Sequence, residues 1–308
     1  MLSLILLSYF SGERINQVHN KLSSLLSKEE IEFELIIIDD GSTDNSFEIA
    51  KKLEAQKENV HAFQLSKNYS SHYAIFAGLN MCKGNCAMPI PDDEQQPYVS
   101  IVDMYRIWEK GSKVIIPYRE ERNDGLINDL LSNTYYKTIN FLSDVTFPQG
   151  GADSFFIDRE LIDLVNERIH PINTSSIIEV LRLGFSPVYY PYVRVKGINT
   201  KSRWTFKKKV KLFKDTFFSS STWPIKIITN LGLFFSIFAF AIIVIYSYIR
   251  FFGNHDFWGE IFPGWTSTII IVSFFSGLIL FSLGIIAEYI WRIYEEVKSR
   301  PGYIIKKK

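Results

Sequence analysis

Two long apolar runs near the C-terminus constrain the fold of this chain more than any other feature. Residues Ile227–Ile249 and Trp265–Ala287 each form 23 consecutive positions without a charged side chain. About 20 apolar residues are enough for a helix to cross the hydrocarbon core of a bilayer. We therefore predict transmembrane helices over residues 225–250 and 265–290. They follow a polar front of residues 1–200, which is large enough for a domain of its own.

Basic residues flank the two runs and predict their orientation. They are Lys207, Lys208, Lys209, Lys211 and Lys214 before the first run, and Arg292, Lys298, Arg300, Lys306, Lys307 and Lys308 after the second. The connecting loop, residues 251–264, holds neither Lys nor Arg, and Arg250 is the one basic residue on that side. The positive-inside rule then places the front domain and the basic tail, residues 291–308, in the cytoplasm.

Composition excludes several classes of protein. The net charge of +1 gives the chain no electrostatic preference for nucleic acid. Cys82 and Cys86 have no second pair to complete a zinc site, so we predict reduced thiols. The apolar opening, residues 2–7, lacks the basic flank and small-residue cleavage site of a signal peptide and reads as a buried first strand.

The polar front alternates apolar runs with helical patterns. Strands are predicted over Leu2–Ser8, Glu34–Ile38, Val60–Leu65, Cys86–Ile90 and Lys113–Pro117, and helices over Ile15–Leu26, Thr43 to about Gln56, Tyr73–Met81 and Val99–Glu109. This order predicts an α/β fold with a mostly parallel sheet and helices on both faces. Ligands of such sheets bind beyond the carboxyl ends of the strands. Two acidic loops, Asp39–Ser42 and Asp92–Glu94, fall there and suggest a nucleotide and a metal.

A basic amphipathic segment lies between the front domain and the first apolar run. Phe206, Val210, Phe213 and Phe217 recur at helical spacing, with lysines on the other faces. We predict that residues 201–222 form a helix that lies in the membrane interface. The alternative is an ordinary helix packed on the domain.

Several segments resemble those of one enzyme family. The stretch Ile36–Ser46, which contains Asp39-Asp40-Gly41-Ser42, closely resembles the nucleotide loop of the family 2 glycosyltransferases, which have a Rossmann-like GT-A fold. Residues 67–69, 74–79 and 117–122 resemble segments of polyprenyl-phosphate sugar synthases, a group that includes the dolichol-phosphate mannose synthases. The tail Glu288–Tyr303 is similar to that of bactoprenol glucosyltransferases. A bare Asp-Asp-Gly-Ser also occurs as a simple turn with a helix cap.

The resemblance implies a reaction and a site. It implies inverting transfer of a sugar from a nucleotide sugar, expected to carry UDP, to polyprenyl (undecaprenyl) phosphate, with Mg²⁺ or Mn²⁺, at the bacterial inner membrane. The nucleotide-binding residues would be Tyr9, Asp39, Asp40, Gly41, Ser42, Lys67 and Asp92. The catalytic residues would be Asp93, Asp153 and Arg119, with Asp93 as metal ligand, and Arg203 and Lys201 would bind the lipid phosphate. Whether the chain forms a homo-oligomer stays open.

The chain departs from the family pattern at the metal motif. Relatives carry Pro-Ile-Asp-x-Asp-Leu-Gln-x-Pro, whereas this chain has Pro-Ile-Pro-Asp-Asp-Glu-Gln-Gln-Pro over residues 89–97. Asp93 falls on the second Asp of the motif, and Pro91 replaces the first. Because Mg²⁺ often takes only one or two protein carboxylates, we retain metal binding, with an acidic surface turn as the alternative. Phe10 also replaces an Asn expected after Tyr9, and the second arginine expected after Arg119 is not seen near Asn128.

Two other functions compete with this one. A transferase that adds a sugar to a hydroxyl of a lipid-linked saccharide, in surface-polysaccharide assembly, would need Asp153 or Glu179 as general base. A lipid phosphate is already anionic at neutral pH and needs no base. A catalytically inactive homologue that binds a nucleotide sugar is the second alternative, and Pro91 in the metal motif is the reason to consider it.

Overall fold

The chain divides into two units, which are described separately. The computed structural model describes residues 1–120, 140, 146–148, 152, 154–172, 174–194, 223–252, 264–298 and 300–306. The first unit comprises Met1–Ser220 with Ser299–Lys308, and the second comprises Ser221–Lys298. The end of the chain therefore returns to the first unit after the second.

The first unit is built on a mixed, mostly parallel sheet. Its strands are β1 (Leu2–Ser8), β2 (Phe33–Asp39), β3 (Val60–Gln64), β4 (Cys86–Pro91), β5 (Val114–Arg119), β6 (Phe156–Asp158) and β7 (Val188–Tyr192), in the order β3-β2-β1-β4-β6-β5-β7. Strands β1 to β4 pair in parallel, as do β5 and β7, whereas β6 is antiparallel to both of its neighbours. The α/β sheet and its first five strands are confirmed, and β6 and β7 are additions to the prediction.

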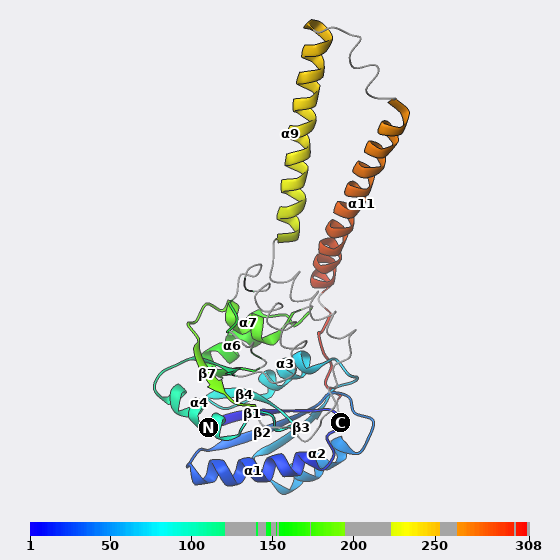
Figure 1. The fold of residues 1–308 in the computed structure, drawn as a ribbon. Helices are drawn as coiled ribbons and strands as arrows, with labels where there is room; N and C mark the ends of the chain where they lie inside the picture. Colours follow the sequence, from blue (N-terminus) through cyan, green and yellow to red (C-terminus); the bar gives the residue numbers. More distant parts are fainter. Residues whose placement is uncertain are drawn as a thin grey trace. The chain divides into compact units, whose positions relative to one another are not determined.

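Helices cover both faces of this sheet (Figure 1). Helices α1 (Arg14–Lys28), α2 (Ser46–Gln56) and α4 (Val99–Glu109) pack with one set of strand residues, which includes Leu2, Leu4 and Leu6. Helices α3 (Ser71–Met81), α6 (Arg159–Arg168) and α7 (Ser176–Arg182) pack with the alternate set, which includes Ile5. Successive strand residues point to opposite faces. Both sets are buried, which explains why the strands read as unbroken apolar runs.

Strand register brings the carboxyl ends of the first four strands to one edge of the sheet. Ser8 on β1 lies opposite Asp39 on β2, and Asp39 lies opposite Gln64 on β3. On the other side of β1, Leu7 pairs with Pro91 at the end of β4. The loops that follow these strands, including both predicted acidic loops, are therefore neighbours.

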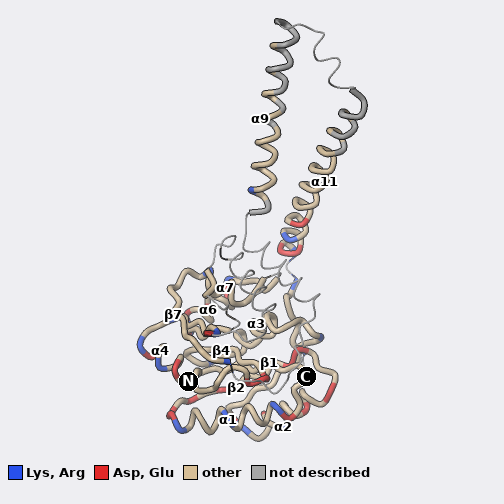
Figure 2. Tube along the Cα trace, in the orientation of Figure 1, with Lys and Arg blue, Asp and Glu red and all other residues tan. Residues whose placement is uncertain are grey.

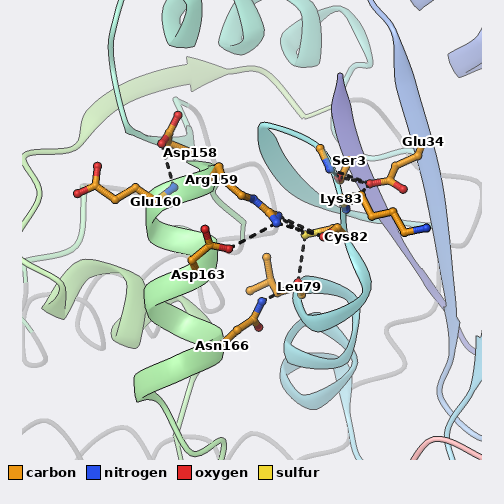
Figure 3. A network of polar contacts seen from close by, with 11 residues as sticks. Ser3, Glu34, Leu79, Cys82, Lys83, Asp158, Arg159, Glu160, Asp163 and Asn166 are labelled. Carbon is orange, nitrogen blue, oxygen red and sulfur yellow. Dashed lines mark hydrogen bonds and ion pairs between the residues drawn. The ribbon is translucent and has the colours of Figure 1, made fainter.

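At the amino end of the strands, a buried carboxylate holds the turn between α3 and β4 (Figure 3). Glu34 on β2 is 3% exposed, and its Oε1 accepts hydrogen bonds from the Ser3 hydroxyl at 2.6 Å and from the backbone N–H groups of Lys83 and Gly84 at 2.6 and 2.9 Å. Hydrogen bonds to a charged acceptor contribute more than neutral ones. Glu34 therefore acts as a structural anchor, far along the strands from the acidic loops.

The same turn is anchored from α6. The guanidinium of Arg159 donates to the Cys82 carbonyl at 3.2 Å and lies 3.1 Å from its Sγ (Figure 3). Both cysteines are buried free thiols, and burial raises the pKa of Cys82 and raises that of Cys86 to about 12. These thiols stay protonated at neutral pH, and their role is packing.

The second unit contains two long helices, α9 (Trp223–Phe252) and α11 (Gly264–Val297). Both predicted apolar runs are therefore helical. Among the described residues, the segment Phe274–Val297 is long and apolar enough to cross a membrane, with a mean hydropathy of 1.8, and Ile225–Phe235 is a shorter apolar stretch. Charged residues on the described part of α11 gather at its C-terminal end (Figure 2). A two-helix membrane hairpin stays a prediction, and the interfacial helix over 201–222 lies outside the described residues.

We predict that Glu34 stabilises the first unit through its two backbone donors. Glu34→Leu should lower the free energy of unfolding by about 3 kcal/mol, because it leaves the Lys83 N–H and the buried Ser3 hydroxyl without their acceptor, while the Gly84 N–H keeps only the Ser3 oxygen, at 2.8 Å. Glu34→Gln keeps an acceptor oxygen and should cost less than half of that. Thermal unfolding of the purified full-length protein measures both changes. Equal melting temperatures for the Leu and Gln variants would contradict the role.

Candidate functional site

The loops after β1 and β2 are joined by hydrogen bonds at the carboxyl edge of the sheet. The backbone N–H of Phe10 donates to the Ser42 hydroxyl at 3.0 Å, and that of Gly12 donates to the Ser46 hydroxyl at 2.9 Å. Ser42, predicted to bind a nucleotide, thus holds the loop that carries Tyr9. Tyr9 itself packs edge-on against Phe10, with ring centroids 4.5 Å apart.

Asp39 shapes the predicted nucleotide loop. Its carboxylate is fully buried and accepts three hydrogen bonds, from the backbone N–H and the hydroxyl of Ser42 at 3.0 and 2.5 Å and from Gln64 Nε2 at 2.9 Å. A carboxylate offers about four lone-pair sites. Three of these sites therefore hold the loop, and the predicted contact of Asp39 with a nucleotide stays a prediction.

Asp40 and Gly41 join this loop to the segment after β3. Asp40 accepts hydrogen bonds from the backbone N–H groups of Tyr69 at 2.7 Å and Ser70 at 3.0 Å, just before α3 begins. Gly41 has a φ of +72°, and a Cβ there would lie 2.4 Å from the backbone carbon of Lys67. Only glycine allows this close approach without a shift of the backbone. The Asp-Asp-Gly motif thus has a structural function, whatever it binds.

Lys67 lies on the exposed side of the same segment. Its ammonium group sits 5.0 Å from the centroid of the Tyr69 ring, a cation–π contact. This arrangement places a cation beside the Asp-Asp-Gly-Ser loop, where the sequence predicts a nucleotide.

Asp92 faces the β1 loop and pairs with a residue that the sequence analysis did not single out. Its Oδ2 lies 2.8 Å from the guanidinium of Arg14 and accepts the Ser11 hydroxyl at 2.6 Å, and the residue is 6% exposed. Arg14 also donates to the carbonyls of Phe10 and Ser11. Asp92 therefore cross-links two loops, and its predicted contact with a nucleotide stays a prediction. No sequence signal pairs Arg14 with Asp92, because 78 positions separate them.

Asp93 differs from Asp92 in its surroundings. It is half-buried, and its pKa is raised, chiefly by burial and also by the charge of Asp92. The positive charges of Arg194 and Arg119 act in the opposite direction, and Arg194 donates to the side chain of Gln95. The structure therefore brings together two predicted catalytic residues, Asp93 and Arg119, and adds Arg194. The signal for Arg194 is its place just after β7, a strand that the sequence analysis missed.

Glu94 and Tyr98 complete the loop. Glu94 pairs with Lys21 on α1 at 2.5 Å, and its φ is +54°. Its other oxygen, Oε1, and the Tyr98 hydroxyl have no hydrogen-bond partner among the described residues and lie beside a cavity of about 10 Å³. That is room for one water. Burial and the three neighbouring carboxylates of this loop raise the pKa of Tyr98, so its hydroxyl stays protonated.

The loop fits a metal only if a ligand shares it. Within the described part of the chain, no three His, Cys, Asp or Glu side chains converge to hold an ion. Asp92 is turned to Arg14 and Glu94 to Lys21, so Asp93 is the carboxylate of this loop suited to a cation. Mg²⁺ commonly uses one carboxylate together with phosphate oxygens and waters. The donor set therefore suits a cation held jointly with a diphosphate.

Other residues predicted for the site lie outside the part of the chain that the structure describes, or they contact residues close to them in sequence. Asp153, Lys201 and Arg203 lie outside the described residues, so their predicted roles stay predictions. Glu179, the alternative base, accepts a hydrogen bond from the Thr174 hydroxyl and lies 3.3 Å from the guanidinium of Arg182. These contacts give Glu179 a local role within α7 and its approach.

Comparison with known proteins identifies the family. The chain is 29% identical to an uncharacterized glycosyltransferase, YkcC, of Bacillus subtilis (strain 168), over 95% of this chain and 89% of that protein. It is 28% identical to the SfII prophage-derived bactoprenol glucosyl transferase of Shigella flexneri, over 99% of this chain and 97% of that protein.

Among solved structures, glucosyl-3-phosphoglycerate synthase from Mycobacterium tuberculosis, in complex with Mn²⁺, UDP-glucose and phosphoglyceric acid, gives a TM-score of 0.45. It shows 16% identity and covers 70% of this chain and 79% of that one. The family model of glycosyl transferase family 2 matches residues 3–163, just over half of the 308-residue chain. The chain therefore belongs to glycosyl transferase family 2 and is a glycosyltransferase.

Proposed function

We propose that this glycosyltransferase moves a sugar from a nucleotide sugar, expected to be UDP-linked, to polyprenyl phosphate at the cytoplasmic face of the bacterial inner membrane, with inversion. The observation that carries the proposal is the place of two arginines at the carboxyl edge of the sheet: Arg119 ends β5 opposite Tyr192 on β7, and Arg194, two residues after Tyr192, donates to Gln95 in the loop that carries Asp93. Full-length similarity to bactoprenol glucosyl transferases supports it.

An arginine pair suits a phosphate acceptor better than a hydroxyl acceptor. A phosphate monoester is anionic at neutral pH and can attack the anomeric carbon directly, so the protein must position it rather than deprotonate it. Guanidinium groups bind phosphate with two parallel hydrogen bonds and give both charge and orientation. A single displacement of this kind inverts the anomeric centre. A hydroxyl acceptor would require Asp153 or Glu179 as a base; Glu179 is engaged with Thr174 and Arg182, and Asp153 lies outside the described residues.

The leaving diphosphate needs positive charge on the donor side. Asp93 would hold Mg²⁺ or Mn²⁺ together with the diphosphate, and a bound cation of this kind would offset charge on the departing oxygen. The loop formed by Asp39, Asp40, Gly41 and Ser42 would receive the nucleotide, with Lys67 beside it. The side chains that build this loop are already fixed by hydrogen bonds, which lowers the cost of ordering them when the donor binds.

We predict different roles for the two aspartates of the altered metal motif. Asp93→Asn should abolish transfer of label from a panel of radiolabelled UDP-sugars to undecaprenyl phosphate in isolated membranes. A chelator should do the same to the unmodified protein, and Mg²⁺ or Mn²⁺ should restore transfer. The reason is that Asp93 is the one carboxylate of the loop that suits the cation. Full transfer by the Asp93 variant would exclude Asp93 as the metal ligand.

Asp93→Asn and Asp92→Asn should have different effects on stability. The pKa of Asp93 is raised in the folded state, so its ionisation destabilises the fold as pH rises above about 4. Asp93→Asn should therefore leave the melting temperature at neutral pH unchanged or higher. Asp92→Asn should lower it, by the equivalent of about 3 kcal/mol, because it breaks a buried pair with Arg14. Thermal unfolding at pH 7 without nucleotide measures both, and a destabilised Asp93 variant would contradict this assignment.

Arg194 should act on the acceptor. Arg194→Ala should raise the KM for polyprenyl phosphate or lower kcat by about 10- to 100-fold, the effect of one charge-assisted phosphate contact. Arg194→Lys should recover only part of the loss, since lysine lacks the planar fork. Arg106→Ala is the matched control, because Arg106 pairs with Glu109 at 2.8 Å on the exposed side of α4. Equal losses of donor and acceptor binding in Arg194→Ala would place Arg194 on the diphosphate instead.

The two apolar helices should form a hairpin with both ends in the cytoplasm. The reason is the excess of lysine and arginine before α9 and after α11, and the lack of both in residues 251–264. A reporter fused after Lys308 should be cytoplasmic, and one inserted near Asn254 should be on the other side of the membrane. Activity of both fusions on the same side would exclude the hairpin.

A further inference from the structure

The end of the chain pairs with the edge strand β3, beside the nucleotide loop. We call residues Arg300–Lys306, which follow α11, the C-terminal strap. The backbone N–H of Ser66 donates to the Ile304 carbonyl at 2.8 Å, and that of Lys306 donates to the Gln64 carbonyl at 2.8 Å. These bonds flank an antiparallel bridge between Leu65 and Ile305. In Figure 1 this red segment ends beside β3.

Side chains of the strap are built into the first unit. Tyr303 and Ile305 are partly buried against the core cluster that includes Leu65, and burial raises the pKa of Tyr303. Gly302 passes so close to the α6–α7 connection that a Cβ there would lie 2.1 Å from the Pro171 carbonyl oxygen. The strap therefore occupies a defined place on the domain.

Lys306 contacts the side chain that orients Asp39. Its ammonium donates to Gln64 Oε1 at 2.9 Å, while Gln64 Nε2 donates to Asp39 Oδ2 at 2.9 Å and to the Ser42 carbonyl at 3.3 Å. The amide of Gln64 has one acceptor end and one donor end. The Lys306 ammonium bound at Oε1 therefore keeps Nε2 directed at the Asp39 carboxylate. If the amide were flipped, its oxygen would face the carboxylate oxygen of Asp39 and the carbonyl oxygen of Ser42, and both contacts would be repulsive.

The backbone contacts of the strap act on the same segment. Ser66 begins the stretch that carries Lys67, against whose backbone Gly41 packs, and Tyr69 and Ser70, whose N–H groups Asp40 binds. Every residue of the Asp-Asp-Gly part of the loop thus contacts the segment 64–70. The strap holds that segment from its other side, at Gln64 and Ser66.

We propose that the C-terminal strap is a positioning element of the donor site, with Lys306 and Gln64 as positioning residues for Asp39 and Ser42. The inference rests on the proposed function, because it takes the Asp39–Ser42 loop to bind the nucleotide. It goes further in making nucleotide affinity depend on residues that follow the last apolar helix. Among the described residues, the strap contacts Gln64 and Ser66 in the segment that supports the donor loop, so it should affect the donor and not the lipid acceptor.

Lys306→Met tests the relay through Gln64. Titration of purified full-length protein with UDP, and separately with GDP, both with Mg²⁺, should show about 2- to 10-fold weaker binding of the nucleotide that the unmodified protein prefers, the effect of one hydrogen bond. The KM for the donor should rise in parallel, while the KM for polyprenyl phosphate and the melting temperature stay unchanged. Lys306→Arg should retain most of the affinity.

Three further substitutions separate the relay from a general effect of charge or fold. Lys298→Met is the matched control: Lys298 is an exposed lysine at the end of α11 that bonds to Tyr294 at 3.1 Å, and its loss should change nothing. In a Gln64→Met background, Lys306→Met should have no additional effect, because both substitutions break the same chain of contacts. Gly302→Ala, which displaces the strap backbone, should weaken nucleotide binding more than Lys306→Met does.

The outcomes distinguish this inference from the function on which it rests. An unmodified protein that binds neither UDP nor GDP contradicts the proposed function. If Lys306→Met and Gly302→Ala both bind nucleotide as tightly as the unmodified protein, the positioning role of the strap is wrong, while the proposed function stands. Equal losses in Lys298→Met and Lys306→Met, or equal rises in the KM values of donor and acceptor, would also overturn it, because they would indicate a charge effect or general loss of structure.

Discussion

The hydrogen bonds that Asp39 and Asp40 accept from residues 42 to 70 organise the whole carboxyl edge of the sheet. Asp39 holds Ser42 and Gln64, and Asp40 holds the backbone before α3. Ser42 in turn holds the loop after β1, where Ser11 reaches Asp92. A pair of buried carboxylates thus links four strand ends. Because charged acceptors form strong hydrogen bonds and are costly to leave unpaired, this edge is fixed before any ligand arrives.

A substitution of either motif carboxylate changes two properties of the loop at once. An Asp39 or Asp40 variant removes loop contacts together with any contact to a ligand, so lost activity alone does not assign nucleotide binding to either carboxylate. Substitutions at Gln64 or Lys306 leave the carboxylates in place and change only their support. They separate the shape of the loop from its chemistry, which a direct change of the motif does not do.

The sequence predicted the elements that depend on local patterns and missed those that depend on tertiary contacts. Strands β1 to β5 are apolar runs, and their ends are correct to within two residues. Strand β6 has three residues, and β7 contains Pro191 and remains partly exposed at the sheet edge, so neither carries a strong pattern. From the sequence, Asp92 is predicted to bind the nucleotide and Asp93 to bind the metal. The contrast in their surroundings comes from Arg14, Arg119 and Arg194, which lie far away along the chain.

Pro91 changes the balance between metal and arginine in this site. It ends β4 opposite Leu7, at the position of the first aspartate in the family's metal-motif pattern given above. Without that carboxylate, the described part of this loop would offer a cation one free carboxylate, Asp93, so most of the coordination would have to come from the diphosphate and water. Under the proposed function, the cation and the nucleotide would then have to bind together, because the diphosphate oxygens would supply the ligands that the protein does not. In the proposed site, the arginines near Asp93 would supply fixed positive charge for the acceptor phosphate, and the cation would offset the charge of the donor diphosphate.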